Sequence, residues 1–230
     1  MAGSLSALGA GMAGLVDDMG DLSTIRKSDP PYEVATDNLV AVEHAKGFKG
    51  HLGALRQGRV TTGIMKIVAI GGTAACAATV LQALHSSRRR PAVQALGDWV
   101  VDSALIAGMA NMHNLFDLRP GRALKVGALL STPGMVSPKI RKLSANTLGA
   151  IAVALPNDLN EHTMLGDTGA NALGAVVGVQ IAAQASRPVK FVVFLSVAAL
   201  TMISEKVSFS KVIESCRLLK AVDSWGRRPH

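Results

Sequence analysis

The chain has 230 residues, of which 49% are hydrophobic, 17% charged and 3% aromatic, and its formal net charge is +8. A soluble domain carries nearer to about 25% charged residues, and here the apolar residues form long blocks. This composition excludes a disordered chain and argues against an ordinary soluble globule. Because aromatic side chains are few, nucleic acid is not the expected partner, and we interpret the basic excess as membrane topology.

Seven apolar runs follow one another, at residues 2–16, 63–84, 93–115, 122–138, 143–156, 169–186 and 189–203. They predict an all-α, polytopic membrane bundle of about seven spanning helices. The run at 63–84 is the best spanning candidate, because its 22 residues rise roughly 33 Å as a helix. The run at 93–115 carries Asp98 and Asp102, which must be hidden inside the bundle. The run at 2–16 is shorter than a span, so we expect the chain to begin partway into a longer protein.

Alternating spans leave residues 17–62, 116–122, 157–168 and the tail at 204–230 on one side. With its flanking residues this side holds sixteen of the 24 Lys and Arg residues. By the positive-inside rule it is cytoplasmic. We therefore expect a single domain over 1–230 in the cell membrane, with a cytoplasmic loop at 17–62 and a basic cytoplasmic tail. The polar clusters, and hence the site, fall on the cytoplasmic face.

The first polar cluster, GLVDDMGD, places Asp17, Asp18 and Asp21 at the end of the first run. The dipole of a helix favours cations at that end, and Asp17 and Asp21 share a face and repel each other. This arrangement indicates a compensating cation, either a metal ion or a lysine. A solvated acidic loop is the alternative.

The next segment, KGFKGHLGALRQGRVTTGIMK, is basic, with Lys46, Lys49, Arg56, Arg59 and Lys66. An interfacial segment that faces lipid is the simpler interpretation. A cradle for the diphosphate of a nucleotide is the sharper one. Lys66 opens the best spanning run and is the hardest of these cations to explain as surface charge.

The segment NMHNLFDLRPGRALK places Asn111, Asn114 and Asp117 at i, i+3 and i+6. On a helix they share an arc of roughly 120°. Such oxygen ligands suit Mg²⁺, which takes few protein carboxylates and keeps several waters; a polar helix-packing seam is the alternative. Arg119 and Arg122 follow directly and could hold phosphates or anchor the chain at lipid headgroups.

In the segment MLGDTGANALG, Gly166 and Gly169 bracket Asp167 and Thr168 just before an apolar run. An Asp or Thr that caps the helix explains the pattern locally. The functional interpretation is a glycine-rich turn at a helix N-terminus, where a phosphate or a metal-bound phosphate can approach.

In order, the motifs DDxxD, KGxKGH, NxxNxxDLRPGR and GDTGAxxLG resemble the polyprenyl-phosphate N-acetylhexosamine-1-phosphate transferase family. Its members include phospho-N-acetylmuramoyl-pentapeptide transferase and GlcNAc-1-phosphate transferases. The resemblance covers nearly the whole chain from residue 14 onward. It implies a membrane glycosyltransferase of cell-wall and peptidoglycan biogenesis that uses Mg²⁺. Such an enzyme transfers a phospho-N-acetylhexosamine from a UDP-sugar to polyprenyl phosphate and releases UMP.

The resemblance also implies roles for single residues. Asp117 is similar to the metal-binding Asp of NxxNxxD, with Asn114 near it, and Asp167 to the Asp of the glycine-bracketed loop. Asp17 and Asp18 are similar to an acid pair that positions the lipid phosphate or accepts its proton. The expected catalytic residues are Asp17, Asp18 and Asp117, and the expected metal ligands are Asp117, Asp167 and Asn114. The expected substrate-binding residues are Lys49, Lys66, Asn111, Asn114, Arg119 and Arg122.

Two features depart from the family pattern. The family has more spanning helices than the seven runs found here, and we expect the additional ones to precede Met1. The tail carries Arg217, Arg227 and Arg228 where several members have a His-rich motif. A catalytically inactive, truncated paralogue that acts as a membrane scaffold is therefore the alternative function.

A transporter, with Asp98, Asp102 and Asn111 along a pathway, is the weaker alternative, because most acids cluster at one face. The expected partners are the UDP-sugar, polyprenyl phosphate, the lipid bilayer and a second copy of the chain in a homodimer.

Overall fold

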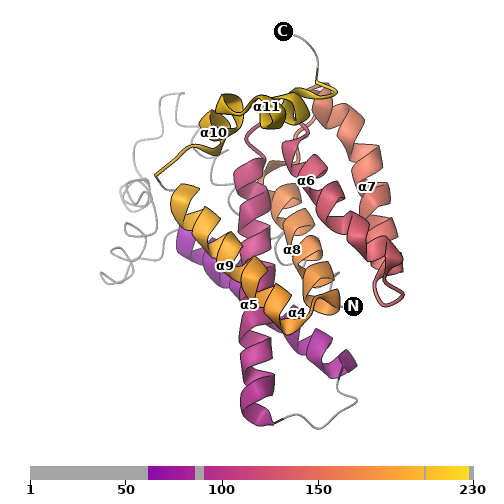
Figure 1. The fold of residues 1–230 in the computed structure, drawn as a ribbon, viewed down its shortest axis with the longest axis vertical. Coiled ribbons are helices and arrows are strands. Elements are labelled where there is room, and N and C mark those ends of the chain that lie inside the picture. Colours follow the sequence, from indigo (N-terminus) through magenta and orange to yellow (C-terminus); the bar gives the residue numbers. More distant parts are fainter. Residues whose placement is uncertain (1–61, 86–90, 205, 228–230) are drawn as a thin grey trace, which may run out of the picture.

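The computed structural model describes residues 62–85, 91–204 and 206–227 (Figure 1). These residues form eight α-helices and one 3-10 helix and contain no strand, which confirms the all-α prediction for this part of the chain. The elements are α4 (Thr62–His85), α5 (Ala92–Phe116), α6 (Arg122–Ser131), η2 (Thr132–Val136), α7 (Arg141–Leu159), α8 (Gly166–Gln184), α9 (Arg187–Ser204), α10 (Phe209–Ser215) and α11 (Arg217–Ser224). The first apolar run, at 2–16, lies outside the described residues.

The apolar run at 122–138 does not form one helix. It divides into α6, whose 10 residues rise only about 15 Å, and the 3-10 helix η2, which contains Pro133 and Gly134. A Cβ atom at Gly134 would lie 1.9 Å from Oγ of Ser144 and 2.8 Å from Cδ1 of Ile140. The backbone therefore turns against α7 at a point where a side chain has no room, and this segment cannot cross a bilayer as a straight helix.

Helix α5 lies in the middle of the bundle and packs against α4, α8 and α9. Its approach to α8 is close because two glycines of α8 face it. A Cβ at Gly174 would lie 2.3 Å from the backbone oxygen of Met109, and one at Gly178 would lie 2.8 Å from Cα of Ile106. The two backbones can meet at this distance only where side chains are absent.

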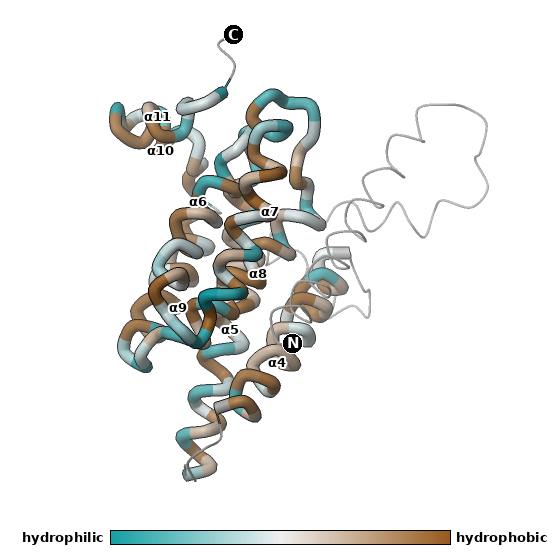
Figure 2. The backbone as a smooth tube through the Cα atoms, turned by 90° about the vertical axis from the view of Figure 1, so that its right-hand side faces the viewer, coloured by the Kyte–Doolittle hydropathy of each residue, from teal (hydrophilic) through white to brown (hydrophobic). Residues whose placement is uncertain are grey.

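Two helices have the length and hydropathy to cross a membrane, over Gly63–Leu84 in α4 and Arg187–Ser204 in α9. Figure 2 shows the long hydrophobic stretch of α4. Helices α5, α7 and α8 have enough residues but are less apolar, and α6 is too short. The prediction of about seven spans is therefore not confirmed, because an apolar run also arises where a helix is buried in a protein core, as α8 is.

Helix α9 exposes much of its apolar surface. Only 6% of its candidate span is buried inside the bundle. Its large exposed apolar side chains are Val189, Phe191, Val192, Leu195, Leu200, Met202 and Ile203. A contiguous exposed apolar surface marks contact with lipid or with another protein.

The two acids inside the run at 93–115 are both paired with cations of α9. Oδ2 of Asp98 accepts a hydrogen bond from Arg187 at 2.6 Å, and Oδ1 of Asp102 accepts one from Lys190 at 2.7 Å. Asp102 is buried, as the sequence predicts for an acid in this run. These pairs tie α5 to α9 and give both acids a structural role.

Candidate functional site

Three carboxylates from three helices converge at one end of the bundle. Asp117 follows the last residue of α5, Asp158 lies in the last turn of α7, and Asp167 lies in the first turn of α8. Both Asp158 and Asp167 lie near enough to act electrostatically on Asp117. We call these three residues the acid cluster.

The electrostatics of the acid cluster are dominated by Asp117. Burial disfavours its charged form, and the charge of Asp158 and, to a smaller extent, that of Asp167 repel it. A hydrogen bond from the backbone of Gly166 works in the opposite direction. The pKa of Asp117 rises as a result from 3.8 to about 7, so this carboxyl group is near half-protonation at neutral pH.

Lys66 reaches the acid cluster from the beginning of α4. Its Nζ atom forms an ion pair with Oδ2 of Asp167, and the two side chains are 16% and 26% exposed. The structure thus brings Lys66 and Asp167, both singled out from the sequence, into direct contact. This contact neutralises part of the negative charge of the cluster.

Asp158 is a member of the cluster that the sequence analysis missed. It is 3% exposed, and its Oδ2 atom accepts a hydrogen bond from the backbone N–H of Gly121. Its Oδ1 atom is buried without a hydrogen-bond partner among the described residues. The signal that could have identified it is an acid in the last turn of a helix, where the dipole favours cations.

Gly121 explains why Asp158 receives this hydrogen bond. Gly121 precedes α6 and has φ of +73°, a backbone conformation that favours glycine. Its N–H points at Asp158 and lies at the N-terminus of α6, where a carboxylate is stabilised by the free N–H groups of the helix. Oδ2 of Asp158 therefore stabilises the turn that follows Asp117, and Oδ1 remains without a hydrogen-bond partner among the described residues.

The two asparagines of the NxxNxxD motif lie on α5 and are partly buried. Asn114 lies one turn before Asp117, and Asn111 lies one turn earlier. Asn171 of α8 is fully buried between the helices, and its Nδ2 atom donates to the backbone oxygen of Asp167 at 2.7 Å. Its Oδ1 atom has no hydrogen-bond partner in the described part of the chain. Buried polar groups therefore extend along α8 beyond Asp167, towards the middle of the bundle.

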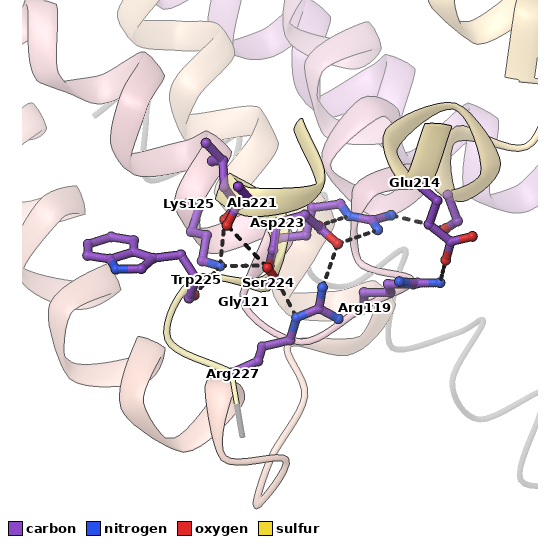
Figure 3. Close-up of polar contacts among 12 residues, drawn as sticks. Arg119, Gly121, Lys125, Glu214, Ala221, Asp223, Ser224, Trp225 and Arg227 are labelled. Atoms are coloured by element: carbon purple, nitrogen blue, oxygen red, sulfur yellow. Dashed lines mark hydrogen bonds and ion pairs between the residues drawn. The ribbon is translucent and has the colours of Figure 1, made fainter. Parts of the chain in front are cut away.

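Arg119 contacts Glu214 of α10 (Figure 3), and Arg122 contacts Asp223 of α11. Arg122 is buried, its Nε donates to Oδ1 of Asp223 at 2.6 Å, and its Nη2 donates to Oδ2 at 3.2 Å. Arg119 forms an ion pair with Glu214. Both guanidinium groups, which the sequence analysis expects to bind phosphate, are thus paired with carboxylates, and a phosphate at Arg122 would have to displace Asp223.

Lys125 completes the attachment of the C-terminal segment. Its Nζ atom donates to the backbone oxygens of Val222, Asp223 and Trp225 at 3.2, 2.9 and 2.6 Å. Arg227, a candidate replacement for the His-rich motif, also donates to Asp223, at 2.5 Å. Burial raises the pKa of Asp223, but the hydrogen bond and charge of Arg122, together with the charges of Arg227 and Arg119, outweigh this effect, and the net pKa is lowered.

The acid cluster fits a divalent cation in part. No group of three His, Cys, Asp or Glu side chains is arranged to hold a metal ion among the residues that the structure describes. Mg²⁺ takes one or two carboxylates and completes its shell with waters and substrate phosphates. Asp117, together with the unpartnered oxygen of Asp158, meets that requirement. Asp167 is shared with Lys66.

Three of the predicted site residues, Asp17, Asp18 and Lys49, lie outside the described residues. Their convergence with Asp117 and Asp167 therefore stays a prediction.

An apolar groove lies beside the acid cluster. It has a volume of about 460 Å³, is open to the outside and runs between α6, α7 and α8. Its lining includes Leu143, Ala150, Ala154, Leu165, Gly169 and Ala172. Leu165 and Gly169 flank Asp167, so an apolar chain in the groove would have one end near the carboxylates.

No family model, no curated protein and no solved structure matches the chain.

Proposed function

We propose that the chain is a membrane-embedded, Mg²⁺-dependent transferase that moves a phospho-N-acetylhexosamine from a UDP-sugar to polyprenyl phosphate and releases UMP. The reaction takes place at the cytoplasmic face of the cell membrane in this proposal. The observation that carries it is the convergence of Asp117, Asp158, Asp167 and Lys66 from four helices at one end of the bundle.

The charges of the cluster suit two anionic substrates. A UDP-sugar and a lipid phosphate repel each other, so positive charge must offset the repulsion and stabilise charge that develops at the diphosphate. Mg²⁺ supplies such stabilisation when bound, and Asp117 and Asp158 are the residues that would hold it. Lys66 brings a second cation to the same place. Because the pKa of Asp117 is about 7, this carboxyl group can release its proton near neutral pH.

The surroundings of the cluster suit a lipid acceptor and a soluble donor. Helices α4 and α9 have the length and hydropathy of membrane spans, and α9 exposes apolar side chains along its length. The apolar groove between α6, α7 and α8 is suited to isoprenoid units, with its end at Leu165 beside Asp167. In our proposal the lipid phosphate reaches the cluster from this side, and Asp17 and Asp18 position it.

The test is a transfer assay on the full chain reconstituted in vesicles. We expect a radiolabelled UDP-N-acetylhexosamine and undecaprenyl phosphate to give a lipid-linked product and UMP only when Mg²⁺ is present. Asp117→Asn should abolish the product. Asp98→Asn, which alters a carboxylate on the same helix but within the α5–α9 contact, should retain it. Normal turnover by folded Asp117→Asn protein would refute the assignment.

A non-catalytic membrane scaffold is the second candidate, and one observation favours it. Arg119 and Arg122 are already paired with Glu214 and Asp223, which leaves these cations engaged without a substrate. The scaffold predicts that wild-type protein binds Mg²⁺ and membranes but forms no lipid-linked product with any UDP-sugar. Product formation by the wild-type chain excludes it.

A further inference from the structure

Helix α11 carries an apolar face that is turned away from the bundle. Leu218, Val222 and Trp225 are 73%, 55% and 76% exposed. Leu218 and Val222 lie one turn apart on α11, and Trp225 is the residue that directly follows the helix. Their spacing of i, i+4 and i+7 corresponds to an arc of roughly 60° if the helical path is extended to Trp225. Asp223 lies on another side of α11 and is only 7% exposed. The helix therefore has one side held by the protein and one apolar side without a partner among the described residues.

The contacts of Asp223 fix this orientation. The pair between Arg122 and Asp223 is buried, and Lys125 binds three backbone oxygens of the same segment. Figure 3 shows the ring of Trp225 pointing away from these polar contacts. Rotation of α11 that buried Trp225 would break the ion pair, so the outward apolar face is a stable feature of the fold.

Basic side chains accompany the apolar face. Arg217 precedes Leu218 and lies nearest the edge of this face, Lys220 lies on the opposite side of α11, and Lys211 belongs to α10; all three are exposed. Apolar and tryptophan side chains beside exposed Lys and Arg are typical of helices that lie in the headgroup region of an anionic leaflet. The charge of this surface thus selects an anionic lipid surface among the partners that could cover an apolar face.

The position of α11 fits the same partner. Helices α10 and α11 lie across one end of the bundle rather than along it (Figure 1). They follow the end of α9, a candidate span, where Met202 and Ile203 are 74% and 48% exposed. Exposed apolar side chains thus occur both at the end of α9 and on the segment that follows it.

We propose that α11 lies in the headgroup region of an anionic lipid leaflet, with Leu218, Val222 and Trp225 among the upper acyl chains and Arg217 at the headgroups. This proposal depends on the membrane embedding that we propose above but not on the transferase reaction. Because Arg122 and Lys125 tie α11 to the turn after Asp117, the lipid surface would also set the depth of the acid cluster.

Tryptophan fluorescence tests this proposal directly, because Trp99 and Trp225 are the two tryptophans of the chain. The Trp99→Phe variant, reconstituted in vesicles of phosphatidylcholine with phosphatidylglycerol, reports on Trp225 alone. We expect blue-shifted emission that lipids brominated near the headgroup quench more strongly than lipids brominated near the chain ends. In the same variant, Arg217→Gln should weaken docking. A cation contributes about 1 kcal/mol at an anionic surface, so the docking equilibrium should fall roughly fivefold.

The control is the Trp225→Phe variant, which leaves Trp99. Nε1 of Trp99 donates to Oγ1 of Thr79 at 2.9 Å between α5 and α4, so its emission reports whether the bundle is folded and should not depend on lipid charge. Water-like Trp225 emission without quenching by either brominated lipid would overturn the proposal. A blue shift that follows protein concentration instead of lipid charge would assign the face to a second copy and overturn it as well.

These outcomes are separable from those of the transfer assay, because the fluorescence experiment uses no substrate. Quenching in a chain without transfer activity would leave the proposal on α11 standing and refute the transferase. A chain that stays in the aqueous phase would contradict the membrane embedding on which both depend.

Discussion

Gly174 offers a sharp test of how the site is assembled, because it sets the distance between α5 and α8. A Cβ atom at this position would lie 2.3 Å from the backbone oxygen of Met109 and 2.8 Å from Cα of Ala110. These are backbone atoms, so the contact cannot be relieved by turning a side chain. Helix α8 would have to move away from α5, and Asp167 and Gly166 would move with it relative to Asp117.

The magnitude follows from two opposing terms. Overpacking of a close contact costs about 1–3 kcal/mol, and the backbone contacts at Gly174 place Gly174→Ala at the upper end of that range. Alanine gains about 1 kcal/mol in helix propensity over glycine. We therefore expect Gly174→Ala to lower the free energy of unfolding by about 2 kcal/mol. In the matched control Gly149→Ala, the added Cβ meets nothing within 4 Å, so only the gain of about 1 kcal/mol remains.

Unfolding followed by circular dichroism, with both variants in the same detergent, measures the two changes. The transfer assay then asks whether Gly174→Ala also loses turnover, as the movement of α8 predicts. A Gly174→Ala protein that is as stable as wild type, or that gains stability like Gly149→Ala, would refute the close α5–α8 contact and the assembly of the site that depends on it.

Three further predictions concern the charges. Asp223→Asn leaves buried Arg122 without its carboxylate and should lower the free energy of unfolding by about 3–5 kcal/mol. Asp98→Asn, whose partner Arg187 is half exposed, should lower it by less than about 1 kcal/mol. Equal losses would contradict the burial of the pair between Arg122 and Asp223. The raised pKa of Asp117, about 7, means that a cation competes with a proton below that pH. The apparent Mg²⁺ affinity in calorimetric titrations should therefore rise up to about tenfold per pH unit towards pH 7 and level off above it, and an affinity independent of pH would argue against binding at Asp117. Lys66→Met removes the ammonium group that pairs with Asp167 and should lower the rate of transfer roughly 100-fold while the Mg²⁺ affinity increases. A purely structural lysine would not produce both changes together.

The positions of the long helices follow from the sequence. The apolar run at 63–84 predicts α4 to within one residue at each end, and the run at 93–115 does the same for α5. The ends of both helices lie where apolar residues give way to polar or charged residues or to proline. Such residues begin or end a helix locally, so the boundaries can be predicted from the sequence. The division of the run at 122–138 has a local signal in Pro133, Gly134 and Pro138, which interrupt it. The packing of Gly134 against Ser144, which places η2 against α7, has no such signal.

The number of spans could not be obtained from apolar runs alone. Helix α8 is apolar because its residues from Ala170 to Ala182 are largely buried against neighbouring helices. Helix α9 is apolar with its surface exposed. Both give the same pattern of residues, since the sequence records that a helix avoids water and not which neighbour covers it.

Some charged residues of the site could be selected from the sequence and others could not. Asp117 and Asp167 belong to recognisable motifs, and Lys66 lies at the start of the most apolar run. The pairing of Arg122 with Asp223 joins residues 101 positions apart, and the contact of Asp158 with Gly121 joins residues 37 apart. Such pairs are determined by tertiary packing. The motif alone therefore predicts that Arg122 binds phosphate, whereas in the structure Arg122 forms an ion pair with Asp223 of α11.

Mn²⁺ titration of the full chain in vesicles, followed by electron paramagnetic resonance, measures directly whether the acid cluster binds a divalent cation. We expect the wild-type protein to bind Mn²⁺ and Mg²⁺ to compete for the site. Asp117→Asn should lose this binding, and Asp98→Asn should keep it. Unchanged Mn²⁺ binding by folded Asp117→Asn protein would contradict binding at the acid cluster.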